Sequence, residues 1–461
     1  MNSPVSYYPL SRSVSTEIDP IVTMREENNI EKSQINESIH SYSSTVTLEY
    51  PEGGKKAWMT VLGGFIGITC QFGFTQSTGA IESYISQYIL QDSSDLTISM
   101  IFSIFLFILM FLSMFTGVIF DLYGCKLLTL VGGILMVSGL LATGNCTKVW
   151  QFFLAYSICC GIGASLMQSS LVTVATHFFK KRRGLAMAFV MPGANFGGVI
   201  WPLLCRSLYP KVGFTWTMRI WALVLLCGFT MSLFLISDRH VEIQNFKSDP
   251  FEDKTTSEKI QTFVDFSAVK DMRFCWITLA LCMAEFSTVI SITYIPSYAI
   301  SKGFDQRTGL LALTVCNATG IAGRIIPTIL SDYYGPFNII TIMSVIMTCS
   351  IFIIWLPFGH LKSALFVFCS IYGFAMAAIM TLTPICTAAI SEPSQFGRRY
   401  GTAYFFCSFM NLPALPIAIA LTKTKLQYDS MVIFSGCTTF VAVVSFVICR
   451  VKVGGYGLCK V

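Results

Sequence analysis

Long apolar segments separated by short polar ones make up most of the chain from residue 58 onward. Ten of the twelve segments contain no Asp, Glu, Lys or Arg, and the other two contain one each, Glu285 and Arg324. A helix that crosses a bilayer needs about 20 such residues, whereas strands of a membrane barrel alternate over about ten. The pattern predicts an all-α membrane protein with twelve transmembrane helices over residues 58–81, 98–120, 127–144, 149–179, 184–205, 220–237, 274–301, 309–331, 337–359, 363–391, 400–422 and 430–449.

One long charged segment divides the predicted helices into two sets of six. We expect six-helix bundles over 57–237 and 272–450, joined by a cytoplasmic linker over 238–271. Residues 1–56 are rich in Ser, Asn and Glu and show no apolar periodicity, which predicts a disordered cytoplasmic tail. Residues 451–461 are expected to form a short cytoplasmic tail at the other end.

Short motifs recur at matching places in the two sets. Asp121 and Asp332 each begin a turn that ends in Gly three residues later, after the second and the eighth helix, with an offset of 211 residues. Arg183 opens the fifth helix and Arg399 the eleventh, with an offset of 216 residues. Two nearly equal offsets predict two parallel halves, an organisation typical of secondary transporters that bind solute between their halves.

The two turns indicate a latch between the halves. The glycine that ends each turn, Gly124 or Gly335, would permit a tight reversal with positive φ. The aspartate could cap the next helix, or it could pair with cations at the mouth of the fifth or eleventh helix; a plain capped turn is the alternative. The residues expected to act in the motion of the halves are Gly117, Asp121, Gly124, Lys126, Arg182, Arg183, Asp332, Arg398 and Arg399.

The charge pattern indicates both the environment and the orientation of the helices. Only 12% of the residues are charged, about half of the roughly 25% usual in soluble domains, so we expect a lipid bilayer around them. Basic clusters at 180–183 and 398–399 fall on one side, which the positive-inside rule assigns to the cytoplasm together with both termini. Scattered cations such as Lys211 and Lys302 fall on the opposite side. The net charge of +6 gives no indication of nucleic-acid binding.

Charged residues inside membrane helices are costly and usually functional. Arg324 shares one face of the eighth helix with Asn317, and its planar guanidinium could hold an anionic or carbonyl-rich solute. Glu285 could pair with Arg324 or carry a proton, and Glu82 is expected at the interface or against the seventh helix. A structural role is the alternative for each of these residues. The predicted solute-binding residues are Gln76, Asn195, Glu285, Tyr294, Asn317, Arg324 and Asn411.

Three stretches resemble a known family. Gly117, Asp121, Gly124 and Lys126 resemble the loop 2–3 signature of the major facilitator superfamily. The stretch CGIGASLMQSSLVTVATHFFKKRRGLAMAFVMPGANFGG, residues 160–198, resembles the helix 4–5 signature of its monocarboxylate porter family. GAIESYI, residues 79–85, is similar to the fungal branch, which includes carboxylate-permease homologues and a riboflavin transporter. The resemblance implies the major facilitator fold and transport by alternating access.

Two positions depart from the proton-coupled animal members of that family. Those members carry a Lys in the first helix where this chain has Gln76, and an Asp in the eighth helix where it has Gly320. Of the three groups that couple proton and solute there, only Arg324 is matched. The resemblance therefore does not extend to lactate–proton symport, and it implies a facilitator or a different coupling route.

These observations predict a secondary transporter of a small organic solute, either a monocarboxylate-like anion or a riboflavin-like heterocycle. Two alternatives stay open: a non-transporting nutrient sensor on the same fold, and a proton-coupled monocarboxylate symporter. No enzymatic activity, metal site or cofactor is expected, because the motifs for them are missing from the sequence. The expected partners are the solute and the lipid bilayer, with an ancillary membrane partner left open. The fungal plasma membrane is the expected location, and the vacuole or another internal membrane is the alternative.

Overall fold

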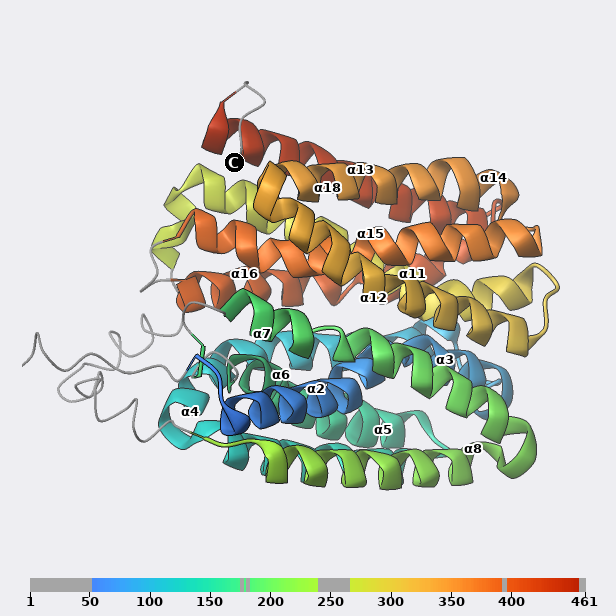
Figure 1. Cartoon of the computed structure of the whole chain (residues 1–461). Coiled ribbons are helices and arrows are strands. Elements are labelled where there is room, and N and C mark those ends of the chain that lie inside the picture. Colours follow the sequence, from blue (N-terminus) through green and yellow to red (C-terminus); the bar gives the residue numbers. More distant parts are fainter. Residues whose placement is uncertain (1–51, 175–177, 180–182, 239–265, 392–395, 456–461) are drawn as a thin grey trace, which may run out of the picture. The chain divides into compact units, whose positions relative to one another are not determined.

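Helices make up nearly all of the described structure (Figure 1). The computed structural model describes residues 52–174, 178–179, 183–238, 266–391 and 396–455. Its first part forms α2 (Lys55–Thr75), α3 (Thr78–Tyr84), α4 (Asp95–Thr143), α5 (Val149–Phe152), α6 (Gly161–Thr173), α7 (Arg183–Val190) and α8 (Gly193–Leu235). Its second part forms α11 (Met272–Ser301), α12 (Gln306–Tyr334), α13 (Pro336–Cys349), α14 (Leu356–Phe358), α15 (Lys362–Ala389), α16 (Phe396–Asn411), α17 (Ala414–Thr422) and α18 (Tyr428–Gly454). Segments of π-helix extend α3 over Ile85–Ile89, join α5 to α6 over Phe153–Cys160, and join α13 to α14 over Ser350–Trp355.

The number of membrane crossings agrees with the sequence pattern. Eleven helical segments in the described residues are long and apolar enough to cross a membrane. One of them, Ala186–Leu235, has 50 residues, about 75 Å at 1.5 Å per residue, and its backbone leaves the helical conformation at Gly213, where φ is 73°. Because a hydrocarbon core is about 30 Å thick, this segment makes two crossings, and twelve crossings result. The turn at Gly213 lies between the predicted helices 184–205 and 220–237, but both helices are longer than predicted, since helix continues on both sides of Gly213.

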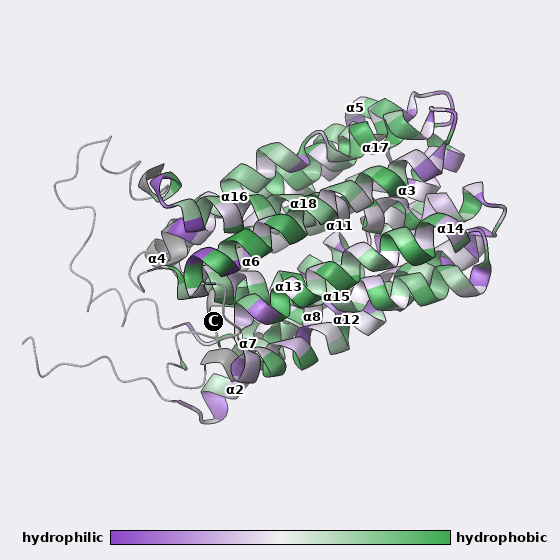
Figure 2. Cartoon of the chain, turned by 90° about the horizontal axis from the view of Figure 1, so that it is seen from above, coloured by the Kyte–Doolittle hydropathy of each residue, from purple (hydrophilic) through white to green (hydrophobic). Residues whose placement is uncertain are grey.

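The crossings gather in two bundles with an apolar outer surface. Figure 1 shows α2 to α8, coloured blue to green, on one side and α11 to α18, coloured yellow to red, on the other. Hydrophobic residues follow the lengths of the helices, and hydrophilic residues gather mainly near helix ends (Figure 2). Large apolar side chains point outward, such as Phe234, which is 85% exposed, and lipid is the solvent that suits such a surface. The boundaries assigned to the two bundles and their linker remain predictions, because residues 239–265 lie outside the described part.

Two glycines reverse the chain where the sequence predicts it. Gly124 has a φ of 77° and separates the two crossings within α4, and Gly335 has a φ of 88° just before α13. An L-residue with a Cβ is strained in this left-handed region. Both predicted turns are therefore confirmed in their backbone conformation.

The helix that follows Gly124 is capped by a residue that is distant in sequence, Asp238. The Asp238 carboxylate, just beyond α8, accepts hydrogen bonds from the backbone N–H of Cys125 and, at 3.3 Å, of Lys126. Next to it, the backbone N–H of Ser237 donates to the Thr60 hydroxyl of α2 at 3.0 Å. The end of α8 is thus bound to both the first and the third crossing.

Capping by the two predicted aspartates is untested for Asp121 and wrong for Asp332. The side chain of Asp121 lies outside the described residues, so its role stays a prediction. Asp332 does not cap α13: the residue at the cap position is Gly335, and Asp332 is exposed. The Asp332 side chain also makes no hydrogen bond or ion pair to another residue of the described part.

Candidate functional site

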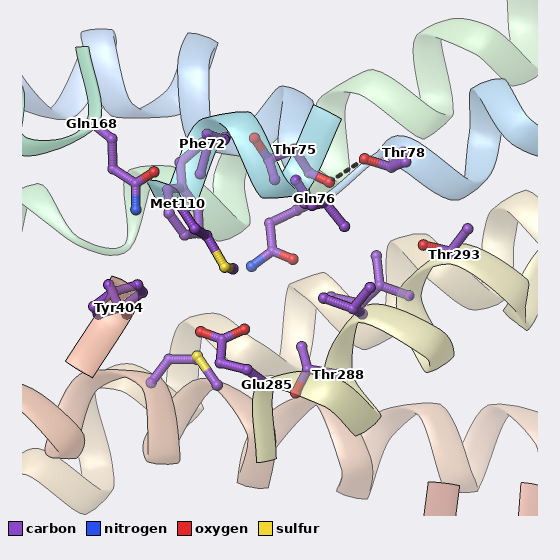
Figure 3. A pocket seen from close by; sticks show the side chains of 15 residues that line it. Phe72, Thr75, Gln76, Thr78, Met110, Gln168, Glu285, Thr288, Thr293 and Tyr404 are labelled. Atoms are coloured by element: carbon purple, nitrogen blue, oxygen red, sulfur yellow. Dashed lines mark hydrogen bonds between the residues drawn. The ribbon is translucent and has the colours of Figure 1, made fainter. Parts of the chain in front are cut away.

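A cavity with a mainly apolar lining and several polar side chains lies between the two bundles (Figure 3). It contains about 580 Å³ of empty volume, the part open to solvent included. Side chains of α2, α3, α4 and α6 form one wall, and side chains of α11, α15 and α16 form the other. The polar residues that line it are Thr75, Gln76, Thr78, Gln168, Glu285, Thr288, Thr293 and Tyr404.

Glu285 supplies the one formal charge among the described residues that line the cavity. Its side chain is 7% exposed, and within the described part of the chain its carboxylate makes no hydrogen bond and no direct ion pair. In Figure 3 the carboxylate points into the cavity, toward the side where Gln76 and Met110 lie. Burying a charge without partners is costly, so this carboxylate is suited to accept hydrogen bonds from whatever fills the cavity.

Two amides face Glu285 from the first bundle. Gln76 lies where α2 ends and α3 begins, and the Thr78 hydroxyl donates to the Thr75 carbonyl at 2.6 Å across this break. Gln168 of α6 points into the same space (Figure 3), and its Oε1 atom is buried without a hydrogen-bond partner in the described structure. A primary amide presents both donors and an acceptor. The first bundle therefore offers neutral hydrogen-bonding groups opposite an acid.

The residues predicted to bind solute separate into three sets: two that line the cavity, two that are buried without lining it, and a cluster of three. Gln76 and Glu285 line the cavity. Tyr294 is buried and its hydroxyl donates to the Leu415 carbonyl at 3.3 Å, and Asn411 is buried with its amide on the Met110 sulfur at 3.3 Å. Met110 itself lines the cavity, so Asn411 lies directly behind the wall. The roles of all these residues in binding remain predictions.

The other three predicted residues form a cluster between α8 and α12. Arg324 is 5% exposed; its Nε–H donates to the Asn195 Oδ1, and its Nη1 donates to the Thr381 hydroxyl at 3.4 Å. The Asn195 amide donates in turn to the backbone carbonyl of Asn317 at 3.2 Å. As expected, Asn317 and Arg324 lie on one buried face of their helix. Glu285 and Arg324 make no direct ion pair, but their charges interact, so the cluster lies beside the cavity without lining it.

One end of the interface between the bundles is closed. A Cβ on Gly79 of α3 would lie 2.4 Å from the backbone oxygen of Ile292 in α11, so only glycine fits this approach. Nearby, the Ser297 hydroxyl donates to the Glu82 carboxylate at 2.7 Å. The expected contact between Glu82 and the seventh crossing is thereby confirmed, and it brings the first and seventh crossings together beside the cavity.

The predicted latch cannot be assembled from the described side chains. Those of Asp121, Arg182, Arg183 and Arg398 lie outside them. Lys126 is exposed, and Arg399 donates from Nη1 to the Ile390 carbonyl at 3.2 Å, within the second bundle. Gly117 lies inside α4. The latch stays a prediction.

Gln168 and Asp238 are the functional candidates that the sequence interpretation missed. Gln168 could have been found as an amide in a segment without charges, the same signal that identifies Gln76. Asp238 carries no such signal, because its partners, Cys125 and Lys126, are more than 110 residues away in sequence.

Twelve crossings in two bundles, with a cavity between them that receives polar side chains from both, define a multi-pass membrane transporter. The family model of the Major Facilitator Superfamily matches residues 65–415, and the chain belongs to this superfamily. The predicted resemblance is confirmed, and the relatives are transporters, which agrees with the expectation that the protein is not an enzyme.

Three similar proteins illustrate the relationship. Riboflavin transporter MCH5 of Saccharomyces cerevisiae is 36% identical over 420 residues, with 88% of this chain and 80% of the relative covered. MFS-type transporter 1 of an Ophiocordyceps species is 30% identical, with 89% of each chain covered. Among solved structures, the xylose transporter XylE from E. coli, in a partially occluded inward open conformation, has a TM-score of 0.66 at 12% identity and covers 85% of this chain and 97% of its own. At that identity, the structural likeness concerns the fold alone.

Proposed function

We propose that this transporter moves an uncharged, hydroxylated heterocycle of the riboflavin kind. The observation that supports the proposal is the composition of the cavity: Gln76 and Gln168 face Glu285, and no Lys, Arg or His is among the described lining residues. A monocarboxylate there would approach the Glu285 carboxylate, and Arg324, the cation that interacts with Glu285, does not line the cavity. Two like charges 4 Å apart repel by about 4 kcal/mol at an effective dielectric constant of 20, which argues against the anionic solute.

The chemistry of such a heterocycle complements the two walls. An imide edge alternates acceptors and a donor, which suits the amides of Gln76 and Gln168. Hydroxyl groups of a side chain could donate to the unpartnered Glu285 carboxylate in charge-assisted hydrogen bonds. The ring of Tyr404 and the thioether of Met110 offer apolar, polarizable contact to a flat ring system. The 36% identity to a protein named as a riboflavin transporter supports the same solute class.

The mechanism proposed is alternating access between the two bundles. Solute would enter the cavity from the end opposite Glu82 and Ser297, and release on the other side would require that hydrogen bond and the Gly79 contact to separate. With Gln76 and Gly320 where proton-coupled relatives carry charges, facilitated diffusion is the coupling mode we favour. Glu285 as a proton carrier is the second candidate, because it is an acid in the cavity. We place the protein in the plasma membrane with both termini in the cytoplasm.

Uptake measurements test the proposal. Cells that lack their own carriers would be given labelled riboflavin or labelled lactate, with and without this protein, at about pH 5 and about pH 7.5. We expect riboflavin uptake that is indifferent to the pH gradient and lost on Gln76→Ala. Gradient-driven lactate uptake would refute the solute class and would favour proton-coupled symport through Glu285. Uptake of neither solute, with a normal amount of protein at the membrane, would favour a sensor.

A further inference from the structure

Two copies of one short motif face each other across the two bundles. Asn195-Phe196-Gly197-Gly198 opens α8, and Asn317-Ala318-Thr319-Gly320 lies in the middle of α12. Each motif places an Asn three residues before a Gly, which brings the two to one face of a helix. Both asparagines are completely buried.

The contacts between these motifs are reciprocal. A Cβ on Gly198 would lie 2.3 Å from the Oδ1 of Asn317, and a Cβ on Gly320 would lie 2.2 Å from the Nδ2 of Asn195. Each asparagine of one bundle therefore occupies the space that the glycine of the other leaves open. We call Asn195, Gly198, Asn317 and Gly320 the Asn–Gly clasp.

Among the described residues, the asparagine side chains of the clasp are hydrogen-bonded except for one oxygen of Asn317. The Asn195 amide donates to the backbone oxygen of Asn317 at 3.2 Å, while Asn195 Oδ1 accepts from Arg324. Asn317 Nδ2 donates to the Leu313 carbonyl of its own helix at 3.1 Å, but its Oδ1 is buried without a partner in the described structure. The Asn195 amide thus bonds to one oxygen of Asn317 while the other oxygen of that residue is unpartnered within the described part of the chain, and a shift of the amide from the backbone oxygen to Oδ1 would conserve the number of hydrogen bonds.

We propose that the Asn–Gly clasp is the joint on which the two bundles turn, and that Asn195 is a positioning residue that holds Arg324 through this motion. A joint needs close approach without bulky side chains, which the two glycines provide. It also needs a hydrogen bond that persists while the bundles rotate. The Asn195 amide can keep such a bond by moving between the backbone oxygen and the Oδ1 atom of Asn317. The proposal concerns the motion of the bundles and does not depend on which solute is carried.

The reciprocity of the contacts gives a cross-rescue test. Gly198→Ala should reduce the maximal uptake rate at least tenfold, because its new methyl group meets the Asn317 amide. Adding Asn317→Ala should restore most of that rate, whereas adding Asn195→Ala should not. Gly320→Ala should show the mirror pattern. Adding Asn195→Ala should restore the rate only to that of Asn195→Ala alone, since Arg324 then loses one of its two acceptors. Gly133→Ala is the matched control, because its Cβ meets only Phe229 at an ordinary 3.4 Å.

Two further readouts separate a joint from a mere packing contact. In the clasp variants KM should stay within twofold while the maximal rate falls. Hydrogen exchange of the purified full chain should change at the closed end, around Gly79 and Ile292, although the substitution is elsewhere. Neutral behaviour of Gly198→Ala, or rescue by either asparagine alike, would overturn the proposal. The exchange measurement needs no solute, so it stands even if riboflavin is not carried.

Discussion

Substituting Glu285 by Gln separates the two solute classes by the sign of its effect. The change keeps the shape of the side chain and removes the charge that faces the cavity. For a solute that donates a hydroxyl to the carboxylate, a charge-assisted hydrogen bond of about 1.5–3 kcal/mol becomes a neutral one of about 0.5–1.5 kcal/mol. The loss of about 1–1.5 kcal/mol corresponds to a rise of roughly five- to twelvefold in KM.

An anionic solute should respond in the opposite direction. The repulsion of about 4 kcal/mol, worked for two charges 4 Å apart, would disappear, so the affinity for a carboxylate should rise, by roughly a thousandfold at most. The assay is competition for labelled riboflavin uptake, with unlabelled riboflavin and with a flavin that carries a carboxymethyl group instead of its hydroxylated chain. We expect Glu285→Gln to weaken the first competitor and strengthen the second.

Glu82→Gln is the matched control for this experiment. It neutralises another buried carboxylate, but one that hydrogen-bonds to Ser297 and does not line the cavity. It should shift both competitors by the same factor. If Glu285→Gln also shifts both competitors in one direction, the carboxylate does not discriminate by charge and the reasoning fails.

The remaining predictions concern single contacts. Gln168→Leu should raise KM for riboflavin roughly two- to twelvefold, since an amide hydrogen bond contributes about 0.5–1.5 kcal/mol; an unchanged KM would remove Gln168 from the site. Gly335→Ala should lower thermal stability in detergent by about 1–2 kcal/mol, because alanine is strained at a φ of 88°, while Gly133→Ala, inside a helix, should not. Asp238→Ala should cost about 0.5–2 kcal/mol through the lost cap, and Asp238→Asn should recover part of it; equal stability of all three proteins would contradict the capping role.

Particular residues show how much of the fold can be predicted from the sequence. The crossings were predictable because the bilayer fixes the length of each apolar helix, and Gly124 and Gly335 were predictable because few other residues reverse a chain so tightly. The continuation of helix on both sides of Gly213 was not, because the segment around it, with Arg206 and Lys211, has the composition of a loop although it is helical. Local composition does not reveal when packing extends a helix beyond its apolar run.

The sequence predicted which kinds of residue are functional candidates, but not which of them lie together. Glu285 and Gln76 were identified as polar groups in apolar helices, and both line the cavity. Arg324 was expected with them, but its bonds to Asn195 lie between helices 129 residues apart in sequence, and only the crossing of α8 and α12 decides that partnership. The threonines of the wall give no signal at all, because Thr288, like many helical threonines, bonds to its own backbone at 2.9 Å.

The double attachment at the end of α8 has a mechanical meaning. Ser237 is held by Thr60 of the first crossing and Asp238 by the backbone that opens the third. A force arriving along the chain beyond residue 238 would be divided between these two anchors instead of pulling on the last turn of α8 alone. Such a load would therefore reach the first and third crossings together with α8, and the first bundle would respond as a unit instead of losing the last turn of one helix.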